Sequence, residues 1–187
     1  MTTDLAVADP AAADARPAAV VEQLHGALLE AMRQGEELGY AGRVELLEPV
    51  IHASFDFETI ASIVTGREWK SASDQQRRAF LDVFTRLSVA TYATNFSDYG
   101  GEQFVTGDSE ESRGARIVRT HLEPGDGDPV SLNYMLREGD DGWRIINVVA
   151  QGVSDLSLKR AEYTAVIQSE GFDSLLERLR GKLKELE

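Results

Sequence analysis

Two adjacent helix-forming stretches between Ser54 and Tyr99 constrain the fold of this chain most, because they hold most of its large aromatic residues. We expect the first helix to begin at Asp56, whose carboxylate can accept a backbone N–H of the first turn, and to end at Gly66. Ser73 and Gln76 have the spacing of a capping box, which predicts the start of the second helix. Apolar residues recur at helical spacing in both, as Phe57, Ile60, Ala61 and Val64, then Phe80, Val83, Phe84, Leu87 and Ala90, and finally Tyr92, Phe96 and Tyr99. So wide an apolar surface must either be covered on two sides or line an apolar cavity.

Four more helices are predicted on either side of a sheet. Helical periodicity indicates segments from Pro17 to about Gly35, from Arg43 to Ser54, from Leu156 to Ser169 and from Phe172 to Leu186. Pro17 suits a first helical position, and Pro49 implies a kink or a later helix start. A loop is expected from Gly35 to Gly42, and Leu158 is expected on the inward face of its helix.

After Gly100 and Gly101 the hydrophobic period changes from 3.6 to 2, which predicts strands. Four strands are expected, at residues 102–109, 114–122, 130–137 and 143–149. A hairpin turn is expected at Gly139–Gly142, and the sheet is expected to end at residues 151–154. Sequential strands joined by short turns form an antiparallel meander. The predicted fold class is therefore α+β, a four-stranded antiparallel meander packed against several helices, with an apolar cavity between sheet and helices as one possibility.

Length and composition limit the remaining choices. The 187 residues suit one domain, expected at residues 17–187 after a disordered, Ala/Asp-rich segment at residues 1–16. The chain has no cysteine, which excludes disulfides and thiolate metal sites. A formal net charge of −13 repels phosphate backbones, so nucleic acid is not expected as a partner. No apolar run approaches the length of a membrane span, and the first residues lack the pattern of a signal peptide. We therefore expect either a cytosolic protein or a sequence from which the signal peptide has been removed.

No catalytic or metal-binding motif is visible in the sequence. His52 and Asp56 have the i, i+4 spacing of metal ligands on a helix, but a third ligand is missing and Asp56 serves better as an N-cap. Gly-x-Ser-x-Gly, Walker and dinucleotide-binding motifs are absent. We expect no enzyme activity, no cofactor and no metal. The apolar stripes have two open interpretations, a packed core or a ligand cavity between the helices and the sheet.

Several motifs, in their order and spacing, resemble the MlaC/toluene-tolerance family of lipid-binding proteins. They are Phe55-Asp56-Phe57 with Ile60, Trp69, the run from Ala90 to Phe96, the run from Trp143 to Val148, residues 152–154, Arg160, Tyr163 and Gly171. The resemblance covers Val20 to Leu183. Finer features, at residues 31–35, 38–39, 42–43, 99–104 and 132–137, resemble its hopanoid-associated HpnM branch. Asn147 and Tyr163 stand where the family usually has Asp and Phe.

This resemblance implies a periplasmic carrier, an auxiliary component of ABC-type lipid transporters, that shields phospholipid acyl chains or a hopanoid and shuttles them between membrane complexes. The family's cavity lies between sheet and helices. From the apolar excess on the two central helices we predict the ligand-binding residues Phe57, Ile60, Val64, Phe84, Leu87, Leu132, Tyr134, Ile146, Val148, Val153, Tyr163 and Ile167. The mouth of this cavity is expected to be bounded by loops and by the helix after Val153.

Two alternatives to the carrier remain open. The first is a small-ligand-binding protein or enzyme of the NTF2-like type, which shares a curved sheet and a cone shape. That alternative needs a polar acid or base on the inner sheet face, where Tyr134 and Asn147 are the candidates. The second is an interaction module with a solid core.

Overall fold

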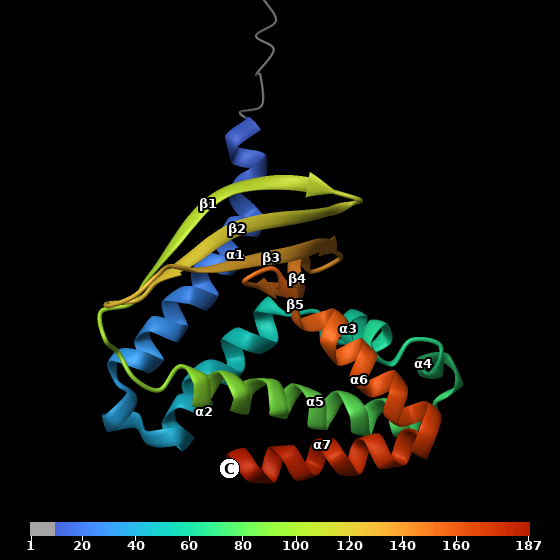
Figure 1. The fold of residues 1–187 in the computed structure, drawn as a ribbon. Coiled ribbons are helices and arrows are strands. Elements are labelled where there is room, and N and C mark those ends of the chain that lie inside the picture. Colours follow the sequence, from blue (N-terminus) through green and yellow to red (C-terminus); the bar gives the residue numbers. More distant parts are fainter. Residues whose placement is uncertain (1–9) are drawn as a thin grey trace, which may run out of the picture.

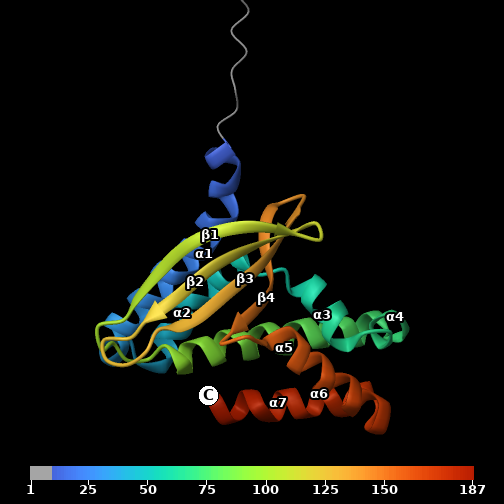
Figure 2. The same ribbon diagram turned by 45° about the horizontal axis from the view of Figure 1, so that its top comes forward.

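The computed structural model describes residues 10–187, with side chains from Pro17 onward. Figures 1 and 2 show a curved sheet above a layer of helices, with α1 crossing behind the strands. The elements in chain order are α1 (Pro10–Arg33), α2 (Gly35–Ser54), α3 (Phe57–Thr65), α4 (Glu68–Ser71), α5 (Asp74–Asn95), β1 (Gln103–Ser112), β2 (Ala115–Glu123), β3 (Val130–Gly139), β4 (Gly142–Ala150), β5 (Val153–Ser154), α6 (Asp155–Glu170) and α7 (Phe172–Leu186).

The expected ends of the central helices are confirmed. The Asp56 carboxylate accepts the Thr59 N–H at 2.9 Å, and Gly66 follows α3 with φ of 63°. Ser73 and Gln76 form both hydrogen bonds of the capping box at the start of α5. The apolar residues on these helices are mostly buried, but Tyr99 lies beyond α5 and its ring is exposed. These boundaries were predictable because caps act within one helical turn.

The first two helices differ from expectation. Helix α1 begins at Pro10, so Pro17 lies inside it instead of at its start, in keeping with the helix propensity of the Ala-rich segment. Residues 1–16 are expected to be disordered, and residues 1–9 of that segment lie outside the described part of the chain. The expected loop at residues 35–42 is wrong, because α2 runs from Gly35 and bends at Gly39, which has φ of 60° and ψ of −175°. The Arg43 guanidinium stabilises this arrangement, since its Nε donates to the Ala93 carbonyl at 2.8 Å and its Nη1 to the Gly35 carbonyl at 2.9 Å.

The sheet is an antiparallel meander in the order β1-β2-β3-β4-β5. The four expected strands are confirmed, as is the hairpin turn that pairs Gly139 with Gly142. A short fifth strand occupies part of the segment where the sheet was expected to end, and Val153 pairs there with Ala150. A bulge after Met135 shifts the β3–β4 register, so that Tyr134 faces Val148 and Leu136 faces Ile145.

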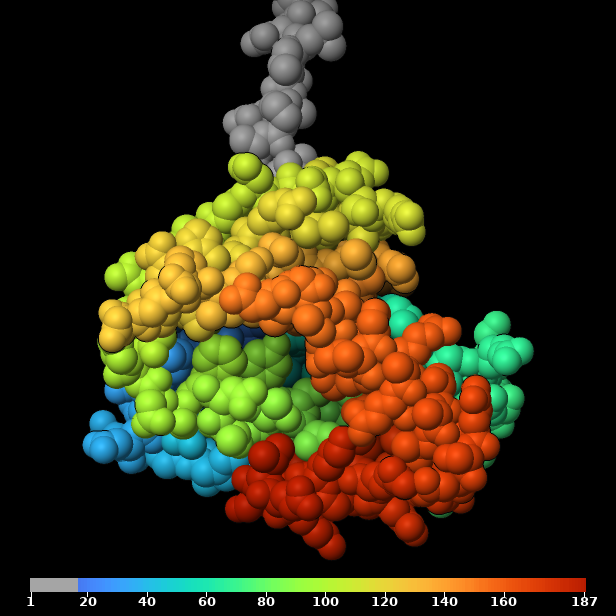
Figure 3. Space-filling view, in the orientation of Figure 1, coloured from blue at the N-terminus to red at the C-terminus, as the bar shows by residue number. Residues whose placement is uncertain are grey.

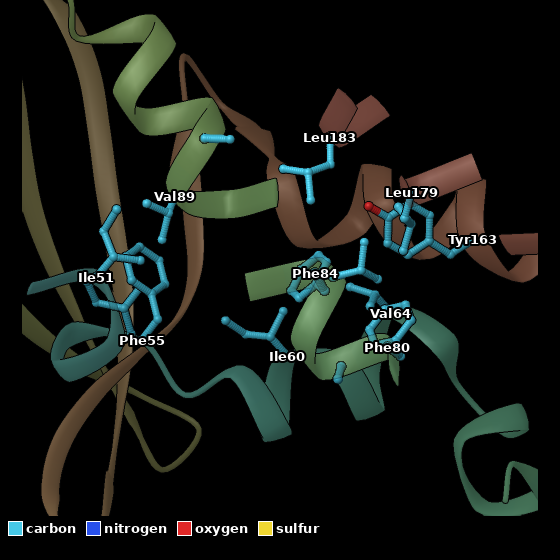
Figure 4. Packing of buried hydrophobic residues seen from close by; sticks show 14 of the residues in the cluster. Ile51, Phe55, Ile60, Val64, Phe80, Phe84, Val89, Tyr163, Leu179 and Leu183 are labelled. Carbon is cyan, nitrogen blue, oxygen red and sulfur yellow. The ribbon is translucent and has the colours of Figure 1, made fainter. Parts of the chain in front are cut away.

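One large buried cluster joins the sheet to the helices. It includes Val118, Tyr134, Leu136 and Ile145 from the sheet and apolar residues from every helix except the single-turn α4, with Ala72 after it. Figure 4 shows Ile60, Val64 and Phe84 pointing toward one another, with Ile51, Phe55 and Val89 to one side. Leu158 was expected to point inward, but it is exposed on α6. The α+β class with helices packed on one sheet is therefore confirmed.

Candidate functional site: an apolar hollow between the sheet and the helices

The space-filling view shows a hollow between the strands and α5. In Figure 3 the strands lie above it, α5 (green) below it and the start of α6 (orange) beside it, with α1 (blue) visible at its back. A carrier of hydrophobic molecules needs such an opening, because a completely packed interior offers no surface to a ligand.

Half-buried apolar side chains come from both walls of this region. Val148 and Leu132 share the inner face of the sheet with Tyr134, since Val148 pairs with Tyr134 and Leu132 lies two residues away. Tyr92 on α5 and Phe96, the residue that follows α5, stack with ring centroids 5.8 Å apart and are also half-buried. All four contact the buried cluster while keeping accessible surface. The sheet and α5 therefore present apolar surface to the space between them.

His25 joins α1 to the inner face of the sheet. Its Nε2 lies 3.0 Å from the Tyr134 hydroxyl, and its ring stacks on Phe104 with centroids 3.9 Å apart. His25 is 3% exposed, and its Nδ1 has no hydrogen-bond partner among the described residues. Burial lowers the pKa of His25 to about 4 and raises that of Tyr134, so both are neutral at neutral pH. The sequence analysis missed His25, although it follows Val21 and Leu24 on an apolar helical stripe.

Tyr92 is a second residue that the sequence analysis did not assign to the site. Its ring contacts Phe55, with centroids 5.9 Å apart, as well as Phe96. Burial raises the pKa of its hydroxyl well above 10, and the nearby Tyr134 hydroxyl and Asp155 carboxylate raise it further. Tyr92 was recognised only as part of an apolar stripe, because helical periodicity does not reveal which hydroxyl group faces open space.

Several predicted ligand-binding residues lie together in a packed part of the helical core. Phe84 stacks on Phe80 with centroids 5.3 Å apart and meets Tyr163 edge-on at 6.3 Å. Ile60, Val64 and Ile167 are buried in the same cluster, and Figure 4 shows Val64 beside Phe80 and Phe84. A ligand would reach these side chains only if the helices separated, so their binding role stays a prediction.

The other predicted residues are dispersed. Phe57 is half-buried and meets Phe84 edge-on at 6.0 Å. Leu87 is half-buried but lies five residues before Tyr92, roughly 140° away around α5. Ile146 is buried at the β4 bulge but does not belong to the main cluster, whereas its neighbour Ile145 does. Val153 is 51% exposed, beside the start of α6.

Asn147, a candidate for acid–base chemistry, holds the start of α6. Its Oδ1 accepts the Ser154 hydroxyl at 3.1 Å and the Leu156 N–H at 3.2 Å. It pairs with Met135 in the strand register, one residue beyond Tyr134, and so belongs to the opposite sheet face. The inner-face interpretation of Asn147 is therefore wrong, and its role is to position a helix.

Two grooves lie elsewhere on the described surface. One of about 500 Å³ lies between the α2–α3 junction and the β3–β4 hairpin, and it is lined by Phe55, Phe57 and mainly polar or charged residues, including His52 and Asp56. The other, of about 270 Å³, lies between α2, α5 and α7 beside the Arg86–Glu187 ion pair.

Among the described residues no group of three or more His, Cys, Asp or Glu side chains is placed to hold a metal ion. None of the described helices combines the length and apolarity needed to cross a bilayer.

The fold and the hollow define a class, an α+β protein with a curved antiparallel sheet and apolar surface facing its helices. The family model described as "MlaC protein" matches residues 22–181, and the chain therefore belongs to the MlaC family.

A relative and a solved structure agree with this assignment. The chain is 25% identical over 131 residues to the intermembrane phospholipid transport system binding protein MlaC of Haemophilus influenzae, a match that covers 67% of this chain and 61% of the relative. The chain thus matches less than two thirds of that relative's length. Its fold is similar to that of a solved phospholipid-binding protein from Ralstonia solanacearum in complex with a phospholipid, with a TM-score of 0.80, 20% identity and coverage of 93% of this chain and 98% of the other.

Proposed function

We propose that this protein is a periplasmic lipid carrier that encloses the acyl chains of a phospholipid in the hollow between the sheet and α5. The observation that carries the proposal is the set of half-buried apolar side chains on the facing walls, Leu132 and Val148 on the sheet and Tyr92 and Phe96 at the end of α5. The family assignment supports it, as do the phospholipid named with the Ralstonia solanacearum structure and the transport system named for the Haemophilus influenzae relative.

The energetics of an acyl chain favour such a site. Each CH₂ group removed from water contributes about 0.8 kcal/mol, so a long chain supplies over about 10 kcal/mol before the costs of ordering it. No bond has to be made or broken, and the protein acts without catalysis. Release requires a membrane transport complex that opens the hollow, which makes such complexes the proposed partners.

A hopanoid is the alternative ligand within the same function. The resemblance to the HpnM branch motivates it, and an aromatic wall of Tyr92, Phe96 and Phe104 suits a rigid fused-ring hydrocarbon as well as a flexible chain. The Asn147 and Tyr134 contacts described above give no support to the NTF2-like enzyme alternative.

Organic extraction of the purified protein followed by mass spectrometry tests the proposal. We expect glycerophospholipid in near-equimolar amount, and a triterpenoid in its place would assign the ligand to the hopanoid class. In parallel, protein from which bound lipid has been removed is incubated with phosphatidylglycerol/phosphatidylethanolamine vesicles and then separated from them. Protein that neither retains lipid from the cell nor takes it up from the vesicles would contradict the carrier function.

A further inference from the structure

The hydroxyl group of Tyr92 belongs to a half-buried side chain and is not used in the packing of the protein. It has no hydrogen-bond partner among the described residues, and the Tyr92 ring contacts Phe55 and Phe96. Within the described part of the chain, the fully enclosed polar side-chain atoms without a partner are His25 Nδ1 and Ser109 Oγ, and the Tyr92 oxygen is not among them. The Tyr92 oxygen therefore faces open space, although the side chain as a whole is not exposed.

The surroundings of this hydroxyl place it on the hollow. The Tyr134 hydroxyl on β3 and the Asp155 carboxylate at the start of α6 are both near enough to influence its ionisation. The sheet and the first turn of α6 are two of the boundaries of the hollow in Figure 3, and α5, which carries Tyr92, is the third. Phe55 and Phe96 contact the Tyr92 ring and restrict its movement, so the hydroxyl is held in a fixed direction.

The chemistry of the surroundings selects the kind of atom that Tyr92 can bind. Because burial keeps the phenol protonated, its O–H is a donor at every physiological pH. The Tyr134 hydroxyl already shares a hydrogen bond with His25 Nε2, whereas the Tyr92 hydroxyl has no partner among the described residues. The Asp155 carboxylate, though paired with Lys159, disfavours a second anion beside it. The best match is a neutral oxygen acceptor attached to the hydrocarbon part of a lipid.

We propose that the Tyr92 hydroxyl donates a hydrogen bond to a neutral oxygen of the bound lipid, an ester carbonyl of a phospholipid or a hydroxyl of a triterpenoid, and so fixes how deep the hydrocarbon enters. In the phospholipid case the acyl chains lie beyond Tyr92 among the apolar residues and the phosphate stays outside, away from Asp155. This inference rests on the proposed function and adds the polar group that the hollow recognises.

Binding to matched lipid pairs tests the contact. Affinities are measured by fluorescence titration for a diester phospholipid and the diether phospholipid of equal chain length and head group, which lacks the carbonyls. The second pair is a hydroxylated triterpenoid and its hydrocarbon parent. The proteins are wild type, Tyr92→Phe and the matched control Tyr99→Phe, which removes a hydroxyl from an exposed ring beside Arg33.

For the pair that matches the natural ligand, wild type should bind the oxygen-bearing member about 2- to 10-fold more tightly than its counterpart. Tyr92→Phe should lose this preference and leave binding of the oxygen-free member unchanged, while Tyr99→Phe behaves as wild type. The pair that shows the loss identifies the source of the oxygen.

Two results would overturn the inference. The first is that wild type binds both members of each pair with equal affinity. The second is that Tyr92→Phe loses the same amount of affinity for both members of a pair, which would reflect altered packing. The wild-type ratio decides the question even if Tyr92→Phe fails to fold. Failure of wild type to bind any of the four lipids would instead contradict the carrier function itself.

Discussion

At the scale of single residues, His25 links stability to pH. Its pKa is about 4 in the folded protein against 6.5 when unfolded, with burial as the cause. The unfolded chain therefore binds the proton more readily, and the free energy of unfolding should fall as the pH drops from about 6.5 to about 4, by up to roughly 3 kcal/mol. Above pH 6.5 this contribution is constant.

Denaturant unfolding of wild type and His25→Gln between pH 7.5 and 4.5 measures the effect. The carboxylates titrate in both proteins, so the difference between the two profiles isolates His25. The variant should be less stable at pH 7, because it weakens the contact with Tyr134, but the gap should narrow as the pH falls. A gap that stays constant would show that His25 takes up its proton equally well in the folded state.

The residue scale also shows what the sequence could not supply. Alternation along the strand predicts that Leu132 and Tyr134 share one sheet face, because it is a local pattern, and the register adds Val148 opposite Tyr134 on that face. His25 and Tyr92 gain their properties from partners distant in the chain, such as Tyr134, 109 residues after His25. Phe84 and Val64 have the same apolar pattern as a cavity wall, yet they pack against other helices.

At the scale of elements, two glycines in consecutive helices predict opposite effects of the same substitution. A Cβ on Gly35, at the start of α2, would lie 1.7 Å from the Ser97 carbonyl oxygen. Gly35→Ala should therefore destabilise the protein by about 1–3 kcal/mol or more. Gly26, exposed within α1, has no atom within 4 Å of such a Cβ, and Gly26→Ala should stabilise by up to about 1 kcal/mol. Thermal unfolding of both variants measures this, and a stable Gly35→Ala protein would contradict the close approach.

The helix ends explain which elements were predictable. Asp56, Ser73 and Gly171 act on backbone groups within one turn, so α3, α5 and the α6–α7 junction followed from the sequence. The course of α2 did not, because its Gly39 bend and the Arg43 bonds to Gly35 and Ala93 depend on tertiary contacts. The two-residue β5 has too few residues to show a period.

The two faces of β4 give a test of the hollow. Val148 pairs with Tyr134 on the inner face, whereas the next residue, Val149, pairs with Asn133 on the outer face. If lipid occupies the hollow, Val148→Trp should fill that space, abolish lipid co-purification and leave the melting temperature nearly unchanged. Val149→Trp is the matched control and should keep its lipid. If Val148→Trp instead loses about 1–3 kcal/mol of stability, the region is a packed core.

At the scale of the whole molecule, the net charge of −13 governs encounters with membranes and partners. Like charges repel, so a protein this acidic approaches an anionic bilayer slowly at low salt, when the screening length is long. Lipid uptake from phosphatidylglycerol-rich vesicles should therefore become faster as salt rises from about 10 mM to about 150 mM, over which the Debye length falls from about 30 Å to about 8 Å.

Uptake from zwitterionic phosphatidylcholine vesicles is the control and should change little, because no net surface charge opposes the protein. Stopped-flow transfer of a fluorescent phospholipid to the protein measures both rates.

The same charge predicts the opposite trend for a transport complex that presents a basic surface. The protein should be steered toward that surface, so the rate at which it associates with the complex should fall with added salt. Uptake from anionic vesicles that is fastest at low salt would show that an attractive basic surface of the protein meets the membrane. In that case the overall charge would serve solubility and have no part in directing the lipid toward a partner.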